Sequence, residues 1–358
     1  MIGKIIRWSI DNSKIVYTIC IMLGLWGAYC LKNIKIDAIP DLSETQVIIF
    51  TEWMGRSPDL IEDQITYPLV TSMVSAPKIK AVRGQSMFGM SFVYVIFEDG
   101  TDLYWARSRV LEYLSKISGQ LPSGVAPSIG PDASGVGWVF QYALIDPTGQ
   151  HNLSHIKTFQ DWYLRYWLAS VAGVAEVASV GGFEKQYQVE VDPNKMSSLK
   201  VSIAMVINAI KENNKDVGGR TIEISEREHY VRGLGYVKDP RDLENISLGS
   251  GPNGTPIRIA DIGKVSLGPN IRRGLSDLDG KGDTVGGVII MRQGEDVSTV
   301  IRNVKKKLEE VKNAFPPGLE LKIVYDRSNL IQEAVRTLWE NLIEEIILVC
   351  IVMYIFLL

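Results

Sequence analysis

The sequence predicts an α+β protein anchored in a membrane. Three observations support this: an uncharged segment near the N-terminus, an apolar run at residues 346–358, and a long region between them in which strand-like and helix-like stretches alternate. The 358 residues are 46% hydrophobic and 22% charged, which is typical of a folded protein. The net charge of −3 and the lack of a basic block argue against a nucleic-acid partner.

The first apolar segment, "IVYTICIMLGLWGAYCL", occupies residues 15–31 between Lys14 and Lys32. As a helix it would reach about 25 Å, and the flanking lysines would extend toward the membrane surface. A cleaved signal peptide is the alternative, but no small-residue cleavage site follows. We therefore expect an uncleaved transmembrane helix at residues 15–32, in contact with membrane lipids.

The charges before this helix predict its orientation. Lys4, Arg7 and Lys14 precede it, against the single acidic residue Asp11. By the positive-inside rule, residues 1–14 stay in the cytoplasm. Residues 33–345 are then expected outside the cytoplasm, and residues 346–358 would begin a second membrane helix.

The first part of the central region predicts a split βαβ, or ferredoxin-like, unit. "TQVIIFTEW" is typical of a strand, and residues 57–74 of a helix with Ser57 as its N-cap and Pro58 at its first position. "SFVYVIFEDGTD" predicts a strand and a turn, after which Asp102 should cap a second helix. The apolar positions of that helix recur with helical period: Leu103, Ala106, Val110, Leu114 and Ile117. The order β-α-β-β-α is that of the ferredoxin-like unit.

A second unit of the same kind follows and is interrupted. Residues 137–146 predict a strand, residues 152–171 a helix, and residues 174–192 two strands that meet at Gly181-Gly182. Residues 218–270 are rich in Gly, Asn and Pro and predict an inserted β-rich subdomain. The strand-helix-strand pattern resumes at residues 285–326.

An internal repeat links the two units. Without gaps, residues 97–134 align with residues 291–328. The matched positions are turn glycines, helix caps, core residues and helix stops, the positions that a strand-turn-helix-strand unit requires. The pairs include Gly100 with Gly294, Asp102 with Asp296, Val110 with Val304, Pro122 with Pro316 and Gly124 with Gly318. Duplication within the fold is the interpretation, with convergence on one supersecondary unit as the alternative.

Catalytic motifs are missing from the sequence, so an enzyme is not expected. It has no G-x-S-x-G, Walker loop, H-E-x-x-H or C-x-x-C. His151 and His155 have the i,i+4 spacing of helical metal ligands, but His151 follows the turn "DPTGQ" and should precede the helix. All three cysteines lie in the apolar segments, which excludes a disulfide or zinc-thiolate site in the central region.

Met87 and Met90, in "GQSMFGMSF", are the candidate metal ligands. Thioether sulfur is a soft ligand that suits Cu(I) or Ag(I), and two methionines at this spacing could share one ion. The alternative is that both side chains fill gaps in the core.

Several long stretches resemble the heavy-metal efflux branch of the resistance–nodulation–division (RND) transporters. They are "DAIPDLSETQVIIFTEWMGRSPDLIEDQITYPLVTSM", "VRGQSMFGMSFVYVIFEDGTDLYWARSRVLEYL", "LPSGVAPSIGPDASGVGWVFQYALID" and "AEVASVGGFEKQYQVEVDP". "GPDASGVGW" is more similar to the CusA-type copper/silver exporters than to the cobalt–zinc–cadmium ones. Against this, "GPNIRRG" has Ile271 where some copper/silver members have Met.

The resemblance implies an organisation and a set of partners. It implies an inner-membrane pump subunit that exports Cu(I) or Ag(I) in exchange for protons, as a homotrimer with a periplasmic adaptor and an outer-membrane channel. The helix at residues 102–118 would line the central pore of the trimer. The implied segments are a first porter subdomain at 33–132, a second at 133–217 and 271–328, a docking insertion at 218–270, a connecting helix at 329–345 and a second transmembrane helix at 346–358.

The resemblance also explains the short second apolar run. Its thirteen residues are fewer than the roughly 20 that span a bilayer. The chain resembles the N-terminal third of the family, from a truncated reading frame or a partial sequence. Neither apolar segment carries the buried carboxylate that a proton relay requires, so we expect no pumping by this part alone. Two alternatives remain open: a membrane-anchored periplasmic binding or sensor module, and an RND-type secretion accessory subunit.

Overall fold

The computed structural model describes residues 2–251, 254–272 and 274–357, without the side chains of residues 2, 4–6, 31–33 and 357. The chain divides into two compact units. The first comprises Met1–Gln150, Gln160–Val180 and Gly286–Leu358, and the second His151–Phe159 and Gly181–Val285.

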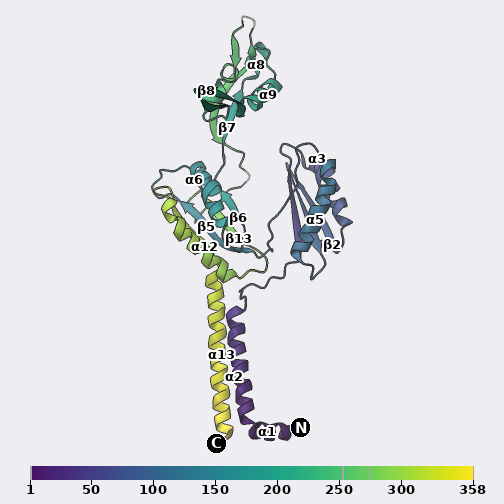
Figure 1. Ribbon diagram of the computed structural model, residues 1–358, viewed down its shortest axis with the longest axis vertical. Helices are drawn as coiled ribbons and strands as arrows, with labels where there is room; N and C mark the ends of the chain where they lie inside the picture. Colours follow the sequence, from purple (N-terminus) through teal and green to yellow (C-terminus); the bar gives the residue numbers. More distant parts are fainter. Residues whose placement is uncertain (1, 252–253, 273, 358) are drawn as a thin grey trace. The chain divides into compact units, whose positions relative to one another are not determined.

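The first four-stranded sheet is antiparallel, in the order β2-β3-β1-β4. It lies in the part of Figure 1 that carries the labels α3, α5 and β2. Its strands are β1 (Gln46–Glu52), β2 (Ile79–Met87), β3 (Met90–Phe97) and β4 (Ser128–Ile129). Alternate residues of β1 and β3 are fully buried because they face the helices, whereas their neighbours point to the opposite face.

The helices that pack on this sheet follow the prediction with two differences. The chain is helical from Pro58 to Val74, as α3 (Pro58–Ile61), η1 (Glu62–Thr66) and α4 (Tyr67–Val74), but η1 is a π-helical turn. Ser57 precedes the helix without a capping hydrogen bond from its side chain. The helix α5 (Leu103–Ile117) and the 3₁₀ turn η2 (Ser118–Gln120) follow β3. All five predicted core residues of α5 are buried: Leu103, Ala106, Val110, Leu114 and Ile117.

The second four-stranded sheet has the equivalent order β14-β5-β13-β6. Its strands are β5 (Trp138–Ile145), β6 (Val174–Gly181), β13 (Val285–Met291) and β14 (Glu320–Asp326). Every residue of the central strand β13 is buried. The helical segments of this part of the chain are α6 (Leu153–Phe159), the π-helical η3 (Gln160–Leu164), α7 (Arg165–Ala169), α12 (Val297–Val311) and η4 (Lys312–Ala314). The predicted α+β fold class is confirmed.

The sequence repeat is also a structural repeat. The helices α5 and α12 have 15 residues each, and each ends in a three-residue 3₁₀ turn. Each begins after an aspartate that accepts a hydrogen bond from the third helical residue: Asp102 from the Trp105 amide, and Asp296 from the Thr299 amide, both at 2.8 Å. The two copies of the repeat therefore use the same aspartate cap at the turn from a buried strand into a helix.

The second compact unit is wider than the predicted insertion at residues 218–270. It contains β7 (Lys185–Val191), whose partner is β12 (Gly263–Pro269) rather than β6, and α9 (Ile203–Asn213), whose Val206 shares a core with Ile259 and Ile262. Residues 181–217 therefore pack with residues 218–270 instead of continuing the second four-stranded sheet. Its other elements are α8 (Pro193–Ser198), β8 (Val217–Ile224), β9 (Arg227–Gly233), α10 (Pro240–Glu244), β10 (Ser247–Ser250), β11 (Pro256–Arg258) and α11 (Ile259–Ile262).

One helix among the described residues is long and apolar enough to cross a membrane. The helix α1 (Ile2–Asp11) precedes α2 (Ser13–Asn33), and the apolar window of α2 runs from Ser13 to Cys30. The last helix, α13 (Arg327–Leu357), is continuous through the predicted connecting and membrane segments. Its apolar part begins only after Glu344 and Glu345.

We expect Asp102→Ala and Asp296→Ala each to weaken the first turn of their helices by about 1 kcal/mol, because each substitution removes the acceptor of a capping hydrogen bond. Amide hydrogen exchange at Trp105 and Thr299 would measure the effect. Asp102→Asn and Asp296→Asn are the matched controls and should exchange at close to the native rate. Equal exchange in the alanine and asparagine variants would contradict the assignment of these caps.

Candidate functional site

The structure brings Met87 and Met90 together. Met87 ends β2, Met90 begins β3, and the two residues face each other across the two-residue turn Phe88-Gly89. Gly89 has φ +72°, in the left-handed region that favours glycine. The Met87 side chain is 42% exposed, so it does not fill a gap in the core.

A third methionine, Met54, lies at the same turn. Its sulfur is 3.4 Å from the position that a Cβ on Gly89 would occupy. Two backbone hydrogen bonds hold the loop and the turn together: the Trp53 amide to the Gly89 carbonyl at 2.9 Å, and the Gly89 amide to the Arg56 carbonyl at 3.0 Å. Sequence reasoning missed Met54 because only the pairing of β1 with β3 brings these distant positions together.

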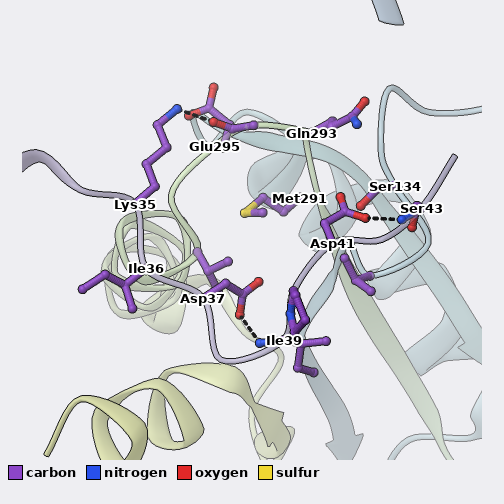
Figure 2. A pocket seen from close by; sticks show the side chains of 14 residues that line it. Lys35, Ile36, Asp37, Ile39, Asp41, Ser43, Ser134, Met291, Gln293 and Glu295 are labelled. Carbon is purple, nitrogen blue, oxygen red and sulfur yellow. Dashed lines mark hydrogen bonds between the residues drawn. The ribbon is translucent and has the colours of Figure 1, made fainter. Parts of the chain in front are cut away.

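A cavity of about 500 Å³ lies where the segment that follows α2 passes the second sheet (Figure 2). Three parts of the chain line it: residues 35–43, residues 134–136, and residues 291–297 at the turn from β13 into α12. Lys35 donates a hydrogen bond to the Gly294 carbonyl, and Met291 also lines the cavity. Its charged lining residues are Lys35, Asp37, Asp41 and Glu295.

Asp41 is fixed in this cavity by serines. Its carboxylate accepts a hydrogen bond from the Ser43 amide at 3.0 Å and another from the Ser134 side chain. Burial acts to raise the pKa of Asp41, but the hydrogen bonds from Ser134 and Ser43 outweigh burial and lower that pKa below 3.8. The carboxylate therefore stays ionised and acts as a structural acceptor at neutral pH.

Next to the cavity, Arg327 joins three parts of the chain. Its side chain is only 4% exposed. The Nη1 atom lies 3.1 Å from the Asp37 carboxylate, and Nη2 donates to the Trp138 carbonyl at 2.9 Å. The Nε atom lies 3.4 Å from the Tyr325 hydroxyl. Arg327 thus ties the segment after α2 to the first residue of β5, at the point where α13 begins.

Asp326, the neighbour of Arg327, has a separate set of partners. It forms an ion pair with Lys305 of α12 and accepts hydrogen bonds from the Ser328 hydroxyl at 2.6 Å and the Ser328 amide at 3.0 Å. Burial acts to raise the pKa of Asp326, but the bonds from Lys305 and Ser328 prevail and hold it below 3.8.

His151 and His155 lie near each other, but no group of three metal-ligating side chains includes them among the described residues. Their rings are 5.9 Å apart, and His151 precedes α6, as predicted. The His155 amide donates to the Asn152 side chain at 2.8 Å, so Asn152 caps this helix. Over the described ranges, no three His, Cys, Asp or Glu side chains are grouped so that they could hold a metal ion.

The pKa of Asp326 predicts a loss of stability in acid. Because its pKa in the folded protein lies below the ordinary value of 3.8, its ionised form stabilises the fold above that value, and this contribution is lost as the pH falls through the lower folded-state pKa. Asp326→Asn should therefore lower the thermal unfolding temperature at pH 7, and the difference from wild type should shrink at pH 3. The control is Asp99→Asn, at a side chain that is 86% exposed, and it should change little at either pH. A difference that stays constant from pH 7 to pH 3 would contradict the assignment.

Comparison with known proteins identifies the family. The AcrB/AcrD/AcrF family matches residues 5–358. The chain is 49% identical over 357 residues to the cation efflux system protein SilA of Salmonella typhimurium and 48% identical to the cation efflux system protein CusA of Escherichia coli K12. It is 33% identical to the cobalt-zinc-cadmium resistance protein CzcA of Cupriavidus metallidurans. All of this chain aligns with 34% of each relative, so it spans about a third of their length.

A solved structure agrees with these sequence matches. The crystal structure of a heavy-metal efflux pump superposes on the chain with a TM-score of 0.87 and 31% identity, covering 98% of this chain and 35% of that one. The resemblance noted in the sequence is thereby confirmed, and it places the chain among transport proteins rather than enzymes. The chain belongs to the AcrB/AcrD/AcrF family of RND transporters, within the heavy-metal efflux branch.

Proposed function

We propose that the chain supplies the N-terminal part of an inner-membrane pump subunit that exports Cu(I) or Ag(I) in exchange for protons. The observation that carries this proposal is the difference in identity: 49% and 48% to SilA and CusA, against 33% to the cobalt-zinc-cadmium protein. The resemblance of "GPDASGVGW" to copper/silver exporters favours the same metals. The exposed Met87 and the half-buried Met90, which flank the β2–β3 turn, are ligands suited to soft monovalent ions.

The proposal includes a location for each segment. Residues 15–32 cross the inner membrane, as the apolar helix α2 supports, and residues 33–345 lie in the periplasm. Residues 33–132 act as the first porter subdomain and residues 133–180 with 271–328 as the second. The docking insertion comprises residues 218–270 and residues 181–217, which pack with them. Residues 329–345 act as the connecting helix, and residues 346–358 begin the second transmembrane helix.

The proposed assembly is a homotrimer with a periplasmic adaptor and an outer-membrane channel. In it, α5 lines the central pore. Its surface suits that role, because Tyr104 and Leu111 are 56% and 57% exposed beside a row of charges. Within this row, Glu112 pairs with Arg109 at 2.7 Å and with Lys116 at 2.9 Å.

A chimaeric pump tests the proposal. Residues 1–358 would replace the matching third of SilA from Salmonella typhimurium, and the chimaera would be expressed in a strain that lacks its own copper and silver pumps. We expect it to raise tolerance to Ag(I) and Cu(I) but not to cobalt or zinc, because SilA supplies the remaining two thirds of the pump. Unmodified SilA is the positive control. A chimaera that reaches the membrane and assembles but confers no silver or copper tolerance would refute the proposal.

A further inference from the structure

Three of the ten methionines in the chain meet at one turn, which we term the methionine turn: Met54, Met87 and Met90. Met54 is 54% exposed and Met87 is 42% exposed. By contrast, Met73 in α4 is fully buried in the core of the same unit. The methionine turn therefore does not serve as core filling, which is the usual role of methionine.

Strand register places Met87 and Met90 on one face of the first sheet. Ser91, Val93 and Val95 of β3 are fully buried, so Met90 and Phe92 point to the opposite face. The ring contact between Phe92 and its partner Phe50, with centroids 5.1 Å apart, shows that paired residues share this face. Met87 is the direct partner of Met90, and such pairs have Cβ atoms about 5 Å apart.

Glu52 of β1 and Met54 of the loop after β1 lie beside Met87 and Met90. Glu52 is the partner of Met90 on this same face, and its side chain is exposed. Met54 lies two residues beyond Glu52, and its sulfur packs against Gly89. The Trp53 amide donates a hydrogen bond to the Gly89 carbonyl, and the Gly89 amide donates one to the Arg56 carbonyl, so the backbones of the three methionines are fixed relative to one another.

The charge at the methionine turn suits a cation. Glu52 is the acidic residue of this row, whereas the guanidinium of Arg56 stacks on the Trp53 ring, with 4.8 Å from Cζ to the ring centroid. Arg83 shares the outer face but lies four residues back along β2 from Met87, about 13 Å away at the usual rise of a strand. At physiological ionic strength that distance exceeds the screening length of about 8 Å.

We propose that the methionine turn is a binding site for one soft monovalent cation, Cu(I) or Ag(I), with the sulfurs of Met54, Met87 and Met90 as ligands and Glu52 as the neighbouring negative charge. Thioether sulfur selects such ions and binds Zn(II) or Co(II) poorly, since these prefer nitrogen, oxygen or thiolate. This site would add metal binding by this segment to the proposed function. The proposal rests on that function only for the source of the ion. Its exposure suits exchange with the surrounding solution.

Methionine-methyl NMR on the full chain in detergent micelles tests this site. The protein carries ¹³C-labelled methionine methyls, and Cys20, Cys30 and Cys350 are replaced by Ala, since thiols would otherwise compete for Ag(I). We expect one equivalent of Ag(I) to shift the methyl signals of Met54, Met87 and Met90, and Zn(II) to shift none of them. Replacing all three by Leu, which preserves the apolar volume, should weaken Ag(I) binding at least tenfold.

Met205→Leu is the matched control, because Met205 is also 42% exposed but lies on α9. This variant should bind Ag(I) as the parent protein does. Unchanged affinity in the triple Leu variant, or equal shifts at Met205 and at the methionine turn, would overturn the proposal and favour an apolar contact surface instead. The outcome is separable from transport. Ag(I) shifts confined to the methionine turn would support the site even if the SilA chimaera conferred no tolerance, and their absence would refute the site even if the chimaera worked.

Discussion

The ion pair between the buried guanidinium of Arg327 and Asp37 is the interaction on which the arrangement of the first compact unit depends. At 4% exposure it has almost no contact with water, so its charge must be balanced by protein groups. Asp37 supplies the counter-charge, and the Trp138 carbonyl accepts a second hydrogen bond. Removing one partner of a buried pair leaves an uncompensated charge, which costs more than the pair itself contributes. The segment after α2 is therefore held where the second sheet and α13 begin.

The same region links the apolar helix α2 to the two four-stranded sheets. Residues 35–43 run from α2 to the first sheet and line the cavity of Figure 2, where Asp41 is bonded to Ser43 and Ser134. Next to Arg327 in the chain, Asp326 joins β14 to α12 through its ion pair with Lys305. A displacement of α2 or α13 would therefore be transmitted to the strands through charged contacts of fixed geometry. In a pump driven from the membrane, this is the connection that the proposed function requires.

Local chemistry in the sequence predicted much of the fold. The caps at Asp102 and Asp296, the core positions of α5 and the repeat are all properties of short stretches, and the structure confirms each. The π-helical turns η1 and η3 were missed. Each adds a single residue to one turn, and the spacing of the apolar residues along a helix does not reveal so small a change. The prediction that β7 pairs with β6 at Gly181-Gly182 was wrong, since the sequence pattern of β7 does not distinguish β6 from β12 as its partner.

The sites depended on long-range pairing and were correspondingly harder to predict. Met87 and Met90 were identified from their spacing, but Met54 joins them only through the register of β1. No local pattern links Asp37 with Arg327, which are 290 positions apart. The assignment of the segments as porter and docking subdomains stays a prediction, as does the assignment of the metal ligands.

A double-mutant cycle between Asp37 and Arg327 tests the central role of this ion pair most directly. The free energy of unfolding of the first unit would be measured for wild type, Asp37→Ala, Arg327→Met and the double variant. The structure predicts a coupling of about 2 kcal/mol, because Asp37→Ala leaves the guanidinium buried and unpaired whereas the double variant removes the charge as well. Additive effects of the two substitutions would contradict this account.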